Sequence, residues 1–342
     1  MAYEKRLIEV LRRTADADPD VRAKAQRALA GALNGPLRQG VMDEDNLDDI
    51  YERQVLEAGT QAYYPLDIVK PGEEDNFVAF TYQNQNRIPE RRIEADELWV
   101  PTYKIANAMD WDVDIARDAR FDLVARALRV YRAGYTRKLN YDGWTTILAA
   151  AVQRGVLVSG ANQSALPFTG RAMLSSATLG GEFTKELVSR MIITMLRGGG
   201  GNMVKTTLTD LYLSAEAIAD MRAWDHSDVS DFSRRELEVQ GGGQLGLSNI
   251  YGVVLHPMQE FGVGQDYQSI IEDLGATQPS GTTQYCIGLD LSTADSFVMP
   301  IRQELTTYED PTLQRQLRAG VYGYMEQGFA CLDNRKVLLG AH

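Results

Sequence analysis

The stretch of this chain that comes nearest to a catalytic motif is RGGGGNMVKTT at residues 197–207, where four glycines precede a lysine. A phosphate-binding loop reads G-x-x-x-x-G-K-[ST], because its second glycine lets backbone N–H groups close on the phosphates. Here Val204 stands before Lys205, and a β-branched side chain resists the backbone conformation that such a loop needs. We therefore interpret the glycines as the end of a helix, beyond which the chain turns into a strand.

The order of the flanking elements supports this interpretation. A phosphate-binding loop follows a strand and opens a helix. The preceding segment FTKELVSRMIITMLR instead predicts a helix, and the following segment VKTTLTDLYLS predicts a strand. The apolar stripe of the predicted helix consists of Leu187, Met191, Ile192 and Met195, with Thr184 as its N-cap.

A second glycine pattern, QGGGQLG, contains Gly241, Gly243 and Gly246 at the spacing of a dinucleotide-binding fingerprint. That fingerprint must open a helix, because the pyrophosphate binds at the helix N-terminus. The next residues, LSNIYGVVLHP, are rich in β-branched and aromatic side chains and predict a strand. We expect a loop between strands here and no nucleotide cofactor.

Side chains that could catalyse other reactions or bind a metal are few and far apart. The three histidines, His226, His256 and His342, have no partner at metal-ligand spacing, and His256 is expected in a loop because a proline follows it. The two cysteines, Cys286 and Cys331, are expected to be buried free thiols. The sequence therefore predicts no catalytic residue, no cofactor and no metal site.

The composition is that of an ordinary globular chain of 342 residues, 44% hydrophobic, with length for one large domain or two of medium size. No apolar stretch reaches the about 18 residues of a membrane span, and the start MAYEKRLIEVLRR lacks the apolar core of a signal peptide. We expect synthesis in a cytoplasm and no membrane partner. The net charge of −12 argues against a dedicated nucleic-acid binder and leaves only weak, non-specific contact with nucleic acid.

The N-terminal part of the chain is basic and the segment after it is strongly acidic. Residues 1–40 hold eight basic and five acidic side chains, whereas residues 41–75 hold eleven acidic and two basic ones. Apolar residues at helical spacing indicate short amphipathic helices, one of them capped by Asp18 with Pro19 at its first position. Because such helices are marginal alone, we expect this arm, residues 1–61, to pack on neighbouring chains, with packing on its own chain as the alternative. The predicted inter-subunit contacts in the arm are Tyr3, Leu7, Val10 and Leu11.

Residues 62–104 show the pattern of a long hairpin with a charged tip. Val78, Phe80 and Tyr82 alternate before the polar stretch QNQNRIPERRIEADE, and apolar residues alternate again after it. A lone two-stranded ribbon is marginal in water, so we expect this hairpin to lie on a neighbouring subunit. Its predicted contacts there are Lys70, Arg87, Arg91 and Arg92.

Residues 112–139 hold the clearest helical pattern in the chain. Acidic residues crowd its start and basic residues its end, as the helix dipole favours. Asn140 is expected to cap a following helix, YDGWTTILAAAVQ. The predicted apolar stripe of the first helix consists of Phe121, Val124, Leu128, Tyr131 and Tyr135.

The order of these parts resembles the major capsid proteins of tailed bacteriophages, whose shell fold is shared with encapsulins and with the floor of herpesvirus capsids. The resemblance rests on the arm, the hairpin and the long helix, and then on TDLYLSAEAIADMRAW, SNIYGVVLHPMQEFG and the closing LRAGVYGYMEQGFACLDNRKVLLG. It implies an α+β fold in which a closing strand pair returns beside a spine helix. The implied parts are the arm at 1–61, the extended hairpin loop at 62–104, a peripheral domain at 105–160 and 300–342, and an axial domain at 161–299.

The resemblance also implies a function. The chain would be a structural subunit, not an enzyme, that assembles with copies of itself as hexamers and pentamers into the icosahedral shell of a tailed bacteriophage around double-stranded DNA. Its implied partners include portal and scaffolding or cement proteins, and its implied location is the virion, after assembly in the host bacterial cytoplasm. Two alternatives stay open, namely the shell of an encapsulin-like cellular nanocompartment and an enzyme with an unrecognised site.

The failed match to a phosphate-binding loop predicts that Lys205→Ala leaves stability and self-assembly nearly unchanged. A lysine outside a binding site changes the free energy of unfolding by under ~0.5 kcal/mol when it is replaced. The checks are phosphate release from ATP and thermal unfolding of both proteins. ATP hydrolysis by the wild type that the variant lacks would contradict our interpretation of the glycines.

Overall fold

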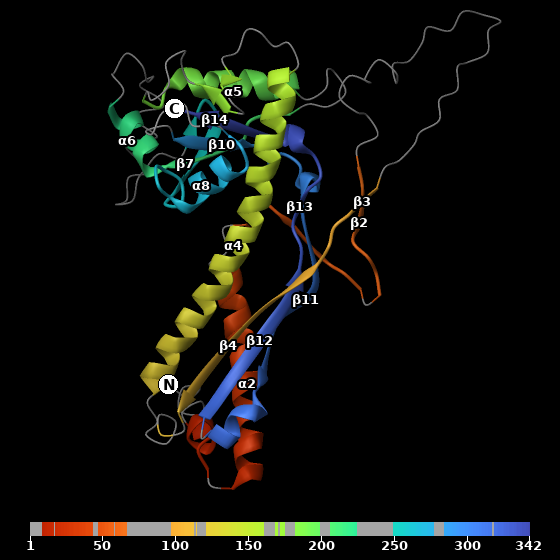
Figure 1. Ribbon diagram of the computed structural model, residues 1–342, viewed down its shortest axis with the longest axis vertical. Coiled ribbons are helices and arrows are strands. Elements are labelled where there is room, and N and C mark those ends of the chain that lie inside the picture. The colour runs from red at the N-terminus through yellow and green to blue at the C-terminus, as the bar shows by residue number, and fades with distance from the viewer. Residues whose placement is uncertain are drawn as a thin grey trace, which may run out of the picture. The chain divides into compact units, whose positions relative to one another are not determined.

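The structure is a computed structural model of mixed helices and strands, which agrees with the α+β class expected from the sequence (Figure 1). It describes residues 9–16, 18–43, 47–57, 59–66, 97–112, 114, 121–160, 168–169, 172–174, 182–198, 206–223, 249–276, 284–316 and 318–342. The chain divides into two compact units. The first comprises Met1–Tyr63, Trp99–Gly143 and Val298–Ala330, and the second Tyr64–Leu98, Trp144–Phe297 and Cys331–His342.

The first unit is built on a five-stranded sheet. Its strands follow the order β1-β11-β12-β4, and β13 pairs with β11. β1 runs parallel to β11, whereas β11 with β12 and β12 with β4 are antiparallel. The bounds are β1 Glu52–Val55, β4 Tyr103–Asp112, β11 Phe297–Glu309, β12 Arg318–Gln327 and β13 Ala330–Cys331, with a short 3-10 helix, η3, at Pro311–Gln316.

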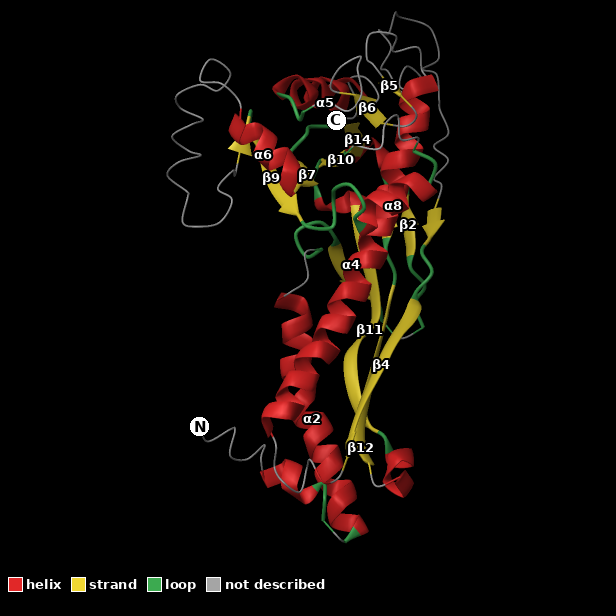
Figure 2. Ribbon diagram, turned by 60° about the vertical axis from the view of Figure 1, so that its left-hand side comes forward, coloured by secondary structure: helices red, strands yellow, loops and turns green. Residues whose placement is uncertain are grey.

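Two helices, α2 (Pro19–Asp43) and α4 (Phe121–Gly160), cover one face of this sheet within the first unit (Figure 2). The face is apolar because every second residue of β4 and β12 points towards the helices. The buried cluster between sheet and helices comprises Leu11, Leu29, Ala30, Leu33, Leu37, Val41, Ile105, Trp111, Tyr131, Tyr135, Leu139, Leu305, Ala319, Val321 and Met325.

The described part of the arm packs on its own chain, which is the alternative that the sequence had left open. Leu29 and Leu33 of α2 are buried in the cluster against this chain's own sheet. Thr307 of β11 donates its hydroxyl to the carbonyl of Ala30 at 3.0 Å. α2 therefore finds the packing surface that a marginal helix needs within the first unit.

α4 is one helix of 40 residues, about 60 Å long at 1.5 Å per residue. The break expected at Asn140 is wrong, since Asn140 lies inside the helix. No glycine in αL conformation or proline stops the helix there, and Tyr51 donates its hydroxyl to the carbonyl of Gly143 at 2.8 Å. A Cβ at Gly143 would lie 2.4 Å from a methyl of Leu47, so this turn of the helix lies close to the residues before β1.

The second unit holds a seven-stranded sheet in the order β5-β6-β14-β10-β7-β9-β8. β7 and β9 are parallel, β10 is antiparallel to β7 and to β14, and β14 is parallel to β6. The strands are β5 Phe168–Thr169, β6 Ala172–Leu174, β7 Asp210–Ser214, β8 Asn249–Ile250, β9 Val253–Met258, β10 Tyr285–Leu289 and β14 Val337–Ala341. The helices are α5 Lys185–Gly198, α6 Ala215–Ala223 and α8 Asp266–Asp273, with 3-10 helices η2 at Ala294–Ser296 and η4 at Asn334–Lys336.

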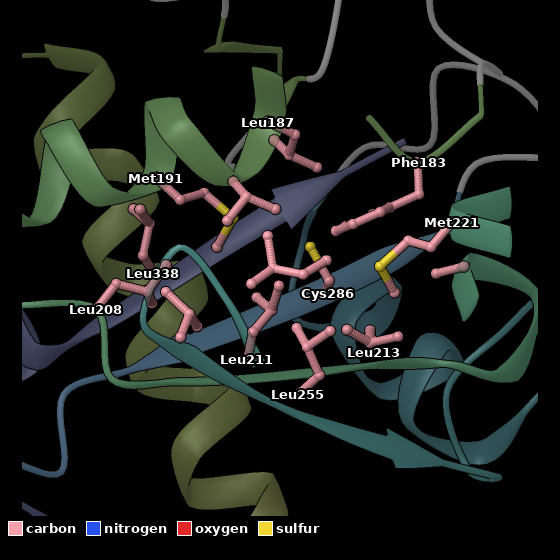
Figure 3. Close-up of a cluster of buried hydrophobic side chains, with 14 of the residues drawn as sticks. Phe183, Leu187, Met191, Leu208, Leu211, Leu213, Met221, Leu255, Cys286 and Leu338 are labelled. Carbon is pink, nitrogen blue, oxygen red and sulfur yellow. The ribbon is translucent and has the colours of Figure 1, made fainter. Parts of the chain in front are cut away.

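The core of the second unit lies between this sheet and helices α5 and α6 (Figure 3). The predicted stripe of α5 is confirmed, because Leu187, Met191 and Met195 are fully buried. Thr184 accepts a hydrogen bond from the Leu187 N–H through its hydroxyl, at 3.4 Å, as an N-cap does. The strand β7 followed by α6 agrees with the pattern read in TDLYLSAEAIADMRAW.

The closing segment of the chain does not form the strand pair that we expected. β12 belongs to the sheet of the first unit, whereas β14 pairs with β10 and β6 in the second. All five residues of β14 are buried there, so the sheet of the second unit needs this strand to fill its centre. The last segment, Cys331–His342, therefore groups with the second unit and not with the rest of the expected range 300–342.

Replacing a core residue of α2 tests whether the arm belongs to the chain's own core. Leu29→Ala should lower the free energy of unfolding by about 2–5 kcal/mol, because the lost side chain leaves a cavity against the sheet. Lys24→Ala, on the exposed side of the same helix, is the control and should change it by under ~0.5 kcal/mol. Urea unfolding of the unassembled protein measures both, and equal small effects would place α2 outside the core.

Burial of His342 predicts an acid-sensitive step. Desolvation lowers the pKa of this imidazole from 6.5 to about 4, although Asp220 and Glu216 act in the opposite direction. Between these two pH values the unfolded chain binds a proton that the folded chain does not. The free energy of unfolding therefore falls by up to about 1.4 kcal/mol for each unit by which the pH is lowered. His342→Gln should flatten the pH dependence of urea unfolding between pH 6.5 and 4. The same slope in both proteins would contradict this assignment.

Candidate functional site

The first glycine run does not lie in the setting of a nucleotide site. α5 ends at Gly198, the first glycine of the run, and β7 begins at Asp210 after it, so the predicted order of helix and then strand is confirmed. Val204 and Lys205 lie outside the described residues. The second run lies outside them as well, and the described chain resumes after it with the predicted strand region, β8 and β9.

His256 lies in strand β9 and not in a loop, so that expectation is wrong. β8 pairs only with the first residues of β9. On the edge of β9 that faces β8, the later residues therefore need no backbone N–H donor, and the proline after His256 is tolerated. The imidazole stacks on Tyr212 with the ring centroids 4.6 Å apart, and its Nε2 lies 2.7 Å from Oδ1 of Asp210.

The His256–Asp210 pair links two neighbouring strands. Burial alone would raise the pKa of Asp210, but hydrogen bonds from His256 and Thr209, together with the charge of His256, lower it. β7 and β9 run parallel with Tyr212 opposite His256, so the pair bridges the strands diagonally. Both side chains therefore help to hold β7 and β9 together.

Other groups that could react are held by the backbone or by burial. Asp290 accepts hydrogen bonds from the N–H groups of Thr207 at 2.9 Å and Ser292 at 3.0 Å, which orders two loops. Cys286 and Cys331 are free thiols, the first buried and the second half-buried. Desolvation raises the pKa of each thiol to about 12, which keeps them protonated and unreactive near neutral pH.

The described part of the chain holds neither a cluster of metal-binding side chains nor a membrane-spanning helix. There, no three side chains of His, Cys, Asp or Glu come together as a metal ion would require. None of the described helices combines the length and the apolar composition of a membrane span.

The predicted contacts of the arm fall into two groups. Tyr3 and Leu7 lie outside the described residues. Leu11 is 1% exposed and Val10 packs beside it, both in the cluster of the first unit. The apolar contacts that the structure gives Val10 and Leu11 are therefore within their own chain, and a role for the arm between subunits stays a prediction.

The predicted contacts of the hairpin, Lys70, Arg87, Arg91 and Arg92, also lie outside the described residues. The structure describes the base of this segment, a two-stranded sheet of β2 (Tyr63–Pro65) and β3 (Glu97–Trp99). Tyr63 is 54% exposed and Trp99 56% exposed on it, so the ribbon offers aromatic surface to a partner.

A row of tyrosines on the first sheet was not singled out from the sequence. Tyr308 of β11 stacks on Tyr322 and on Tyr324 of β12, with centroid distances of 5.6 Å to each. The ammonium of Lys104 lies 5.8 Å from the centre of the Tyr324 ring. Since Val321 and Met325 alternate with these tyrosines and are buried under the helices, the tyrosines lie on the opposite face. The alternation in VYGYMEQ is the signal that could have revealed this face.

Comparison with known proteins points to one fold. No protein-family model matches the sequence, and no curated protein is similar to it in sequence. Among solved structures, the mature capsid of bacteriophage PhiM1 has a TM-score of 0.53 and 10% sequence identity, with 86% of each chain covered. A structure from Microbacterium phage Oxtober96 has a TM-score of 0.54 and 11% identity, covering 87% of this chain and 90% of that one. The capsid of an empty GTA particle has a TM-score of 0.53 and 12% identity, covering 87% and 89%. The chain therefore has the fold of the major capsid proteins of tailed bacteriophages.

Proposed function

We propose that this chain is a structural subunit that self-assembles into the icosahedral capsid shell of a tailed bacteriophage and encloses its double-stranded DNA. The observation that carries the proposal is the fold, since the capsid of bacteriophage PhiM1 matches 86% of the chain at a TM-score of 0.53. A structural match over 86% of the chain extends over parts of both compact units.

The described surface supports self-association. Exposed aromatic side chains gather on the β2–β3 ribbon and in the tyrosine row of the first sheet. Neither surface is covered by another described part of this chain. In a closed shell each modest interface is repeated in every subunit, so the whole gains stability without any single strong contact.

In this proposal the first unit is the peripheral domain and the second unit the axial domain. The extended hairpin loop, expected at residues 62–104, would lie across a neighbouring subunit. The partners are copies of the chain in hexamers and pentamers, a portal, and scaffolding or cement proteins. Contact with packaged DNA is non-specific, because a net charge of −12 argues against a dedicated nucleic-acid binder. The site of assembly is the host bacterial cytoplasm, and the final location is the virion.

The proposal gives the chain no catalytic role. Among the described residues, Asp290 orders loops, His256 bridges strands and Cys286 is buried, so each of these groups serves the fold. An enzyme would instead bring such groups together around a space for a substrate.

Electron microscopy of the purified protein tests the proposal. We expect closed shells of uniform diameter in negative stain and a fast-sedimenting species in analytical ultracentrifugation, alone or with co-expressed scaffolding protein. A chain that stays monomeric or forms only irregular aggregates under both conditions would contradict it.

Limited trypsin digestion tests the hairpin within this proposal. Lys70, Arg87, Arg91 and Arg92 should be cleaved in unassembled protein and protected in shells, because assembly covers them with a neighbour. Arg126, exposed on α4, is the control, since its helix is formed within the subunit in both states. Mass spectrometry identifies the cut sites, and equal protection of the four sites in both states would mean that the segment packs on its own chain.

A further inference from the structure

A pocket lies in the first unit where the helices meet the first sheet. It has a volume of about 90 Å³ and is bounded by the end of α2, by α4 and by strands β1, β11 and β12. Its wall is mostly apolar and includes Val41, Leu139, Ile301, Leu305 and Met325. Because all of these residues belong to the first unit, the pocket is a feature of that unit alone.

One polar side-chain atom in this pocket has no hydrogen-bond partner among the described residues. Gln327, the last residue of β12, is 3% exposed and lines the pocket. Its Nε2 is buried and meets no hydrogen-bond acceptor in the described part of the chain. Buried amide donors are normally paired, so this one is available to an acceptor that enters the pocket.

The mouth of the pocket is electrically neutral. Arg38 and Glu304 form an ion pair of 2.5 Å, with side chains 47% and 38% exposed. Arg53 pairs with Asp48 on the side of β1. With each cation already paired, the mouth does not select a charged ligand. It favours a neutral apolar group instead, and Val55, 69% exposed at the rim, extends the apolar surface outwards.

We propose that this pocket receives an aliphatic side chain of a second copy of the chain, with a backbone carbonyl of that copy accepting a hydrogen bond from Gln327 Nε2. The pocket volume of about 90 Å³ suits one aliphatic side chain, because a cavity of about 150 Å³ already holds a whole benzene molecule. The chain itself exposes side chains of suitable size, among them Val130 at 73%, Leu196 at 53% and Val263 at 49%.

The position of β1 beside the pocket explains how a backbone carbonyl could come near. Among the described strands β1 pairs only with β11, so its other edge leaves backbone groups open. A segment of a second copy that lies along this edge brings side chain and carbonyl to the pocket together. This inference rests on the proposed function, because a shell subunit meets copies of itself at high local concentration.

Two substitutions and a matched control test the pocket. Val55→Glu places a charge at its mouth, whereas Gln54→Glu adds the same charge on the other side of β1, since neighbouring residues of a strand point to opposite faces. Gln327→Met removes the donor and keeps the volume. In light scattering, Val55→Glu should raise the protein concentration needed for half-maximal assembly by about tenfold or more, and Gln54→Glu by less than about twofold.

The free subunit provides the second measurement. Gln327→Met should keep or raise its unfolding temperature, because a buried unpaired donor is lost, and yet weaken assembly, because the contact with the second copy is lost. Val55→Glu should leave the unfolding temperature unchanged, as Val55 is exposed. Assembly of both variants at the wild-type concentration would overturn the proposal.

The outcome for the wild type separates this inference from the proposed function. If it forms smaller oligomers but no shell, the proposed function fails, and the pocket is judged by whether Val55→Glu dissociates those oligomers in sedimentation velocity. If Val55→Glu leaves them intact, the pocket proposal is overturned. If the wild type stays monomeric at every concentration, both are overturned.

Discussion

The hydroxyl of Tyr135 ties helix α4 to the backbone of the sheet beneath it. It accepts a hydrogen bond from the Asn107 N–H at 2.8 Å and donates one to the carbonyl of Gly323 at 2.5 Å, two residues that face each other on β4 and β12. Tyr131 stands beside it, and its hydroxyl would lie 2.7 Å from a Cβ at position 323, so a larger residue there would displace the Tyr131 ring. Burial raises the pKa of both phenols, which keeps their hydroxyls protonated as donors near neutral pH.

The hydrogen bonds of Tyr135 fix α4 on the sheet and so determine which surfaces of the first unit stay exposed to other molecules. With α4 held on the sheet, α2 closes the rest of the apolar face from within the same chain. The opposite face keeps its tyrosine row exposed, and the gap at the end of α2 keeps its pocket. If the chain is the proposed shell subunit, it is folded before it assembles. Its neighbours need only complete surfaces that are already rigid, which lowers the entropy lost on association.

Elements with strong periodicity were predictable from the sequence, and their partners were not. The stripe of α5 and the apolar face of α4 follow from side-chain spacing, and the structure buries Met191 and Tyr135 accordingly. Spacing could not show that α2 packs on its own sheet, since an apolar stripe is the same whichever surface covers it. Nor could it show that β14 joins the second sheet, because strand pairing depends on residues far apart in sequence. Of the candidate surface, the tyrosine row was visible as an alternation, but the pocket arises only where helices and strands meet.

Hydrogen–deuterium exchange on the same protein before and after assembly tests most directly the claim that a preformed subunit builds a shell. The account predicts that the amides of α2, α4 and β12 are equally protected in both states, because their contacts lie within one chain. Protection should be gained on assembly at β1, β2 and β3, where the described chain leaves strand edges and aromatic side chains uncovered. If α2 and α4 gain protection only in shells, the arm folds on its neighbours and the account is contradicted.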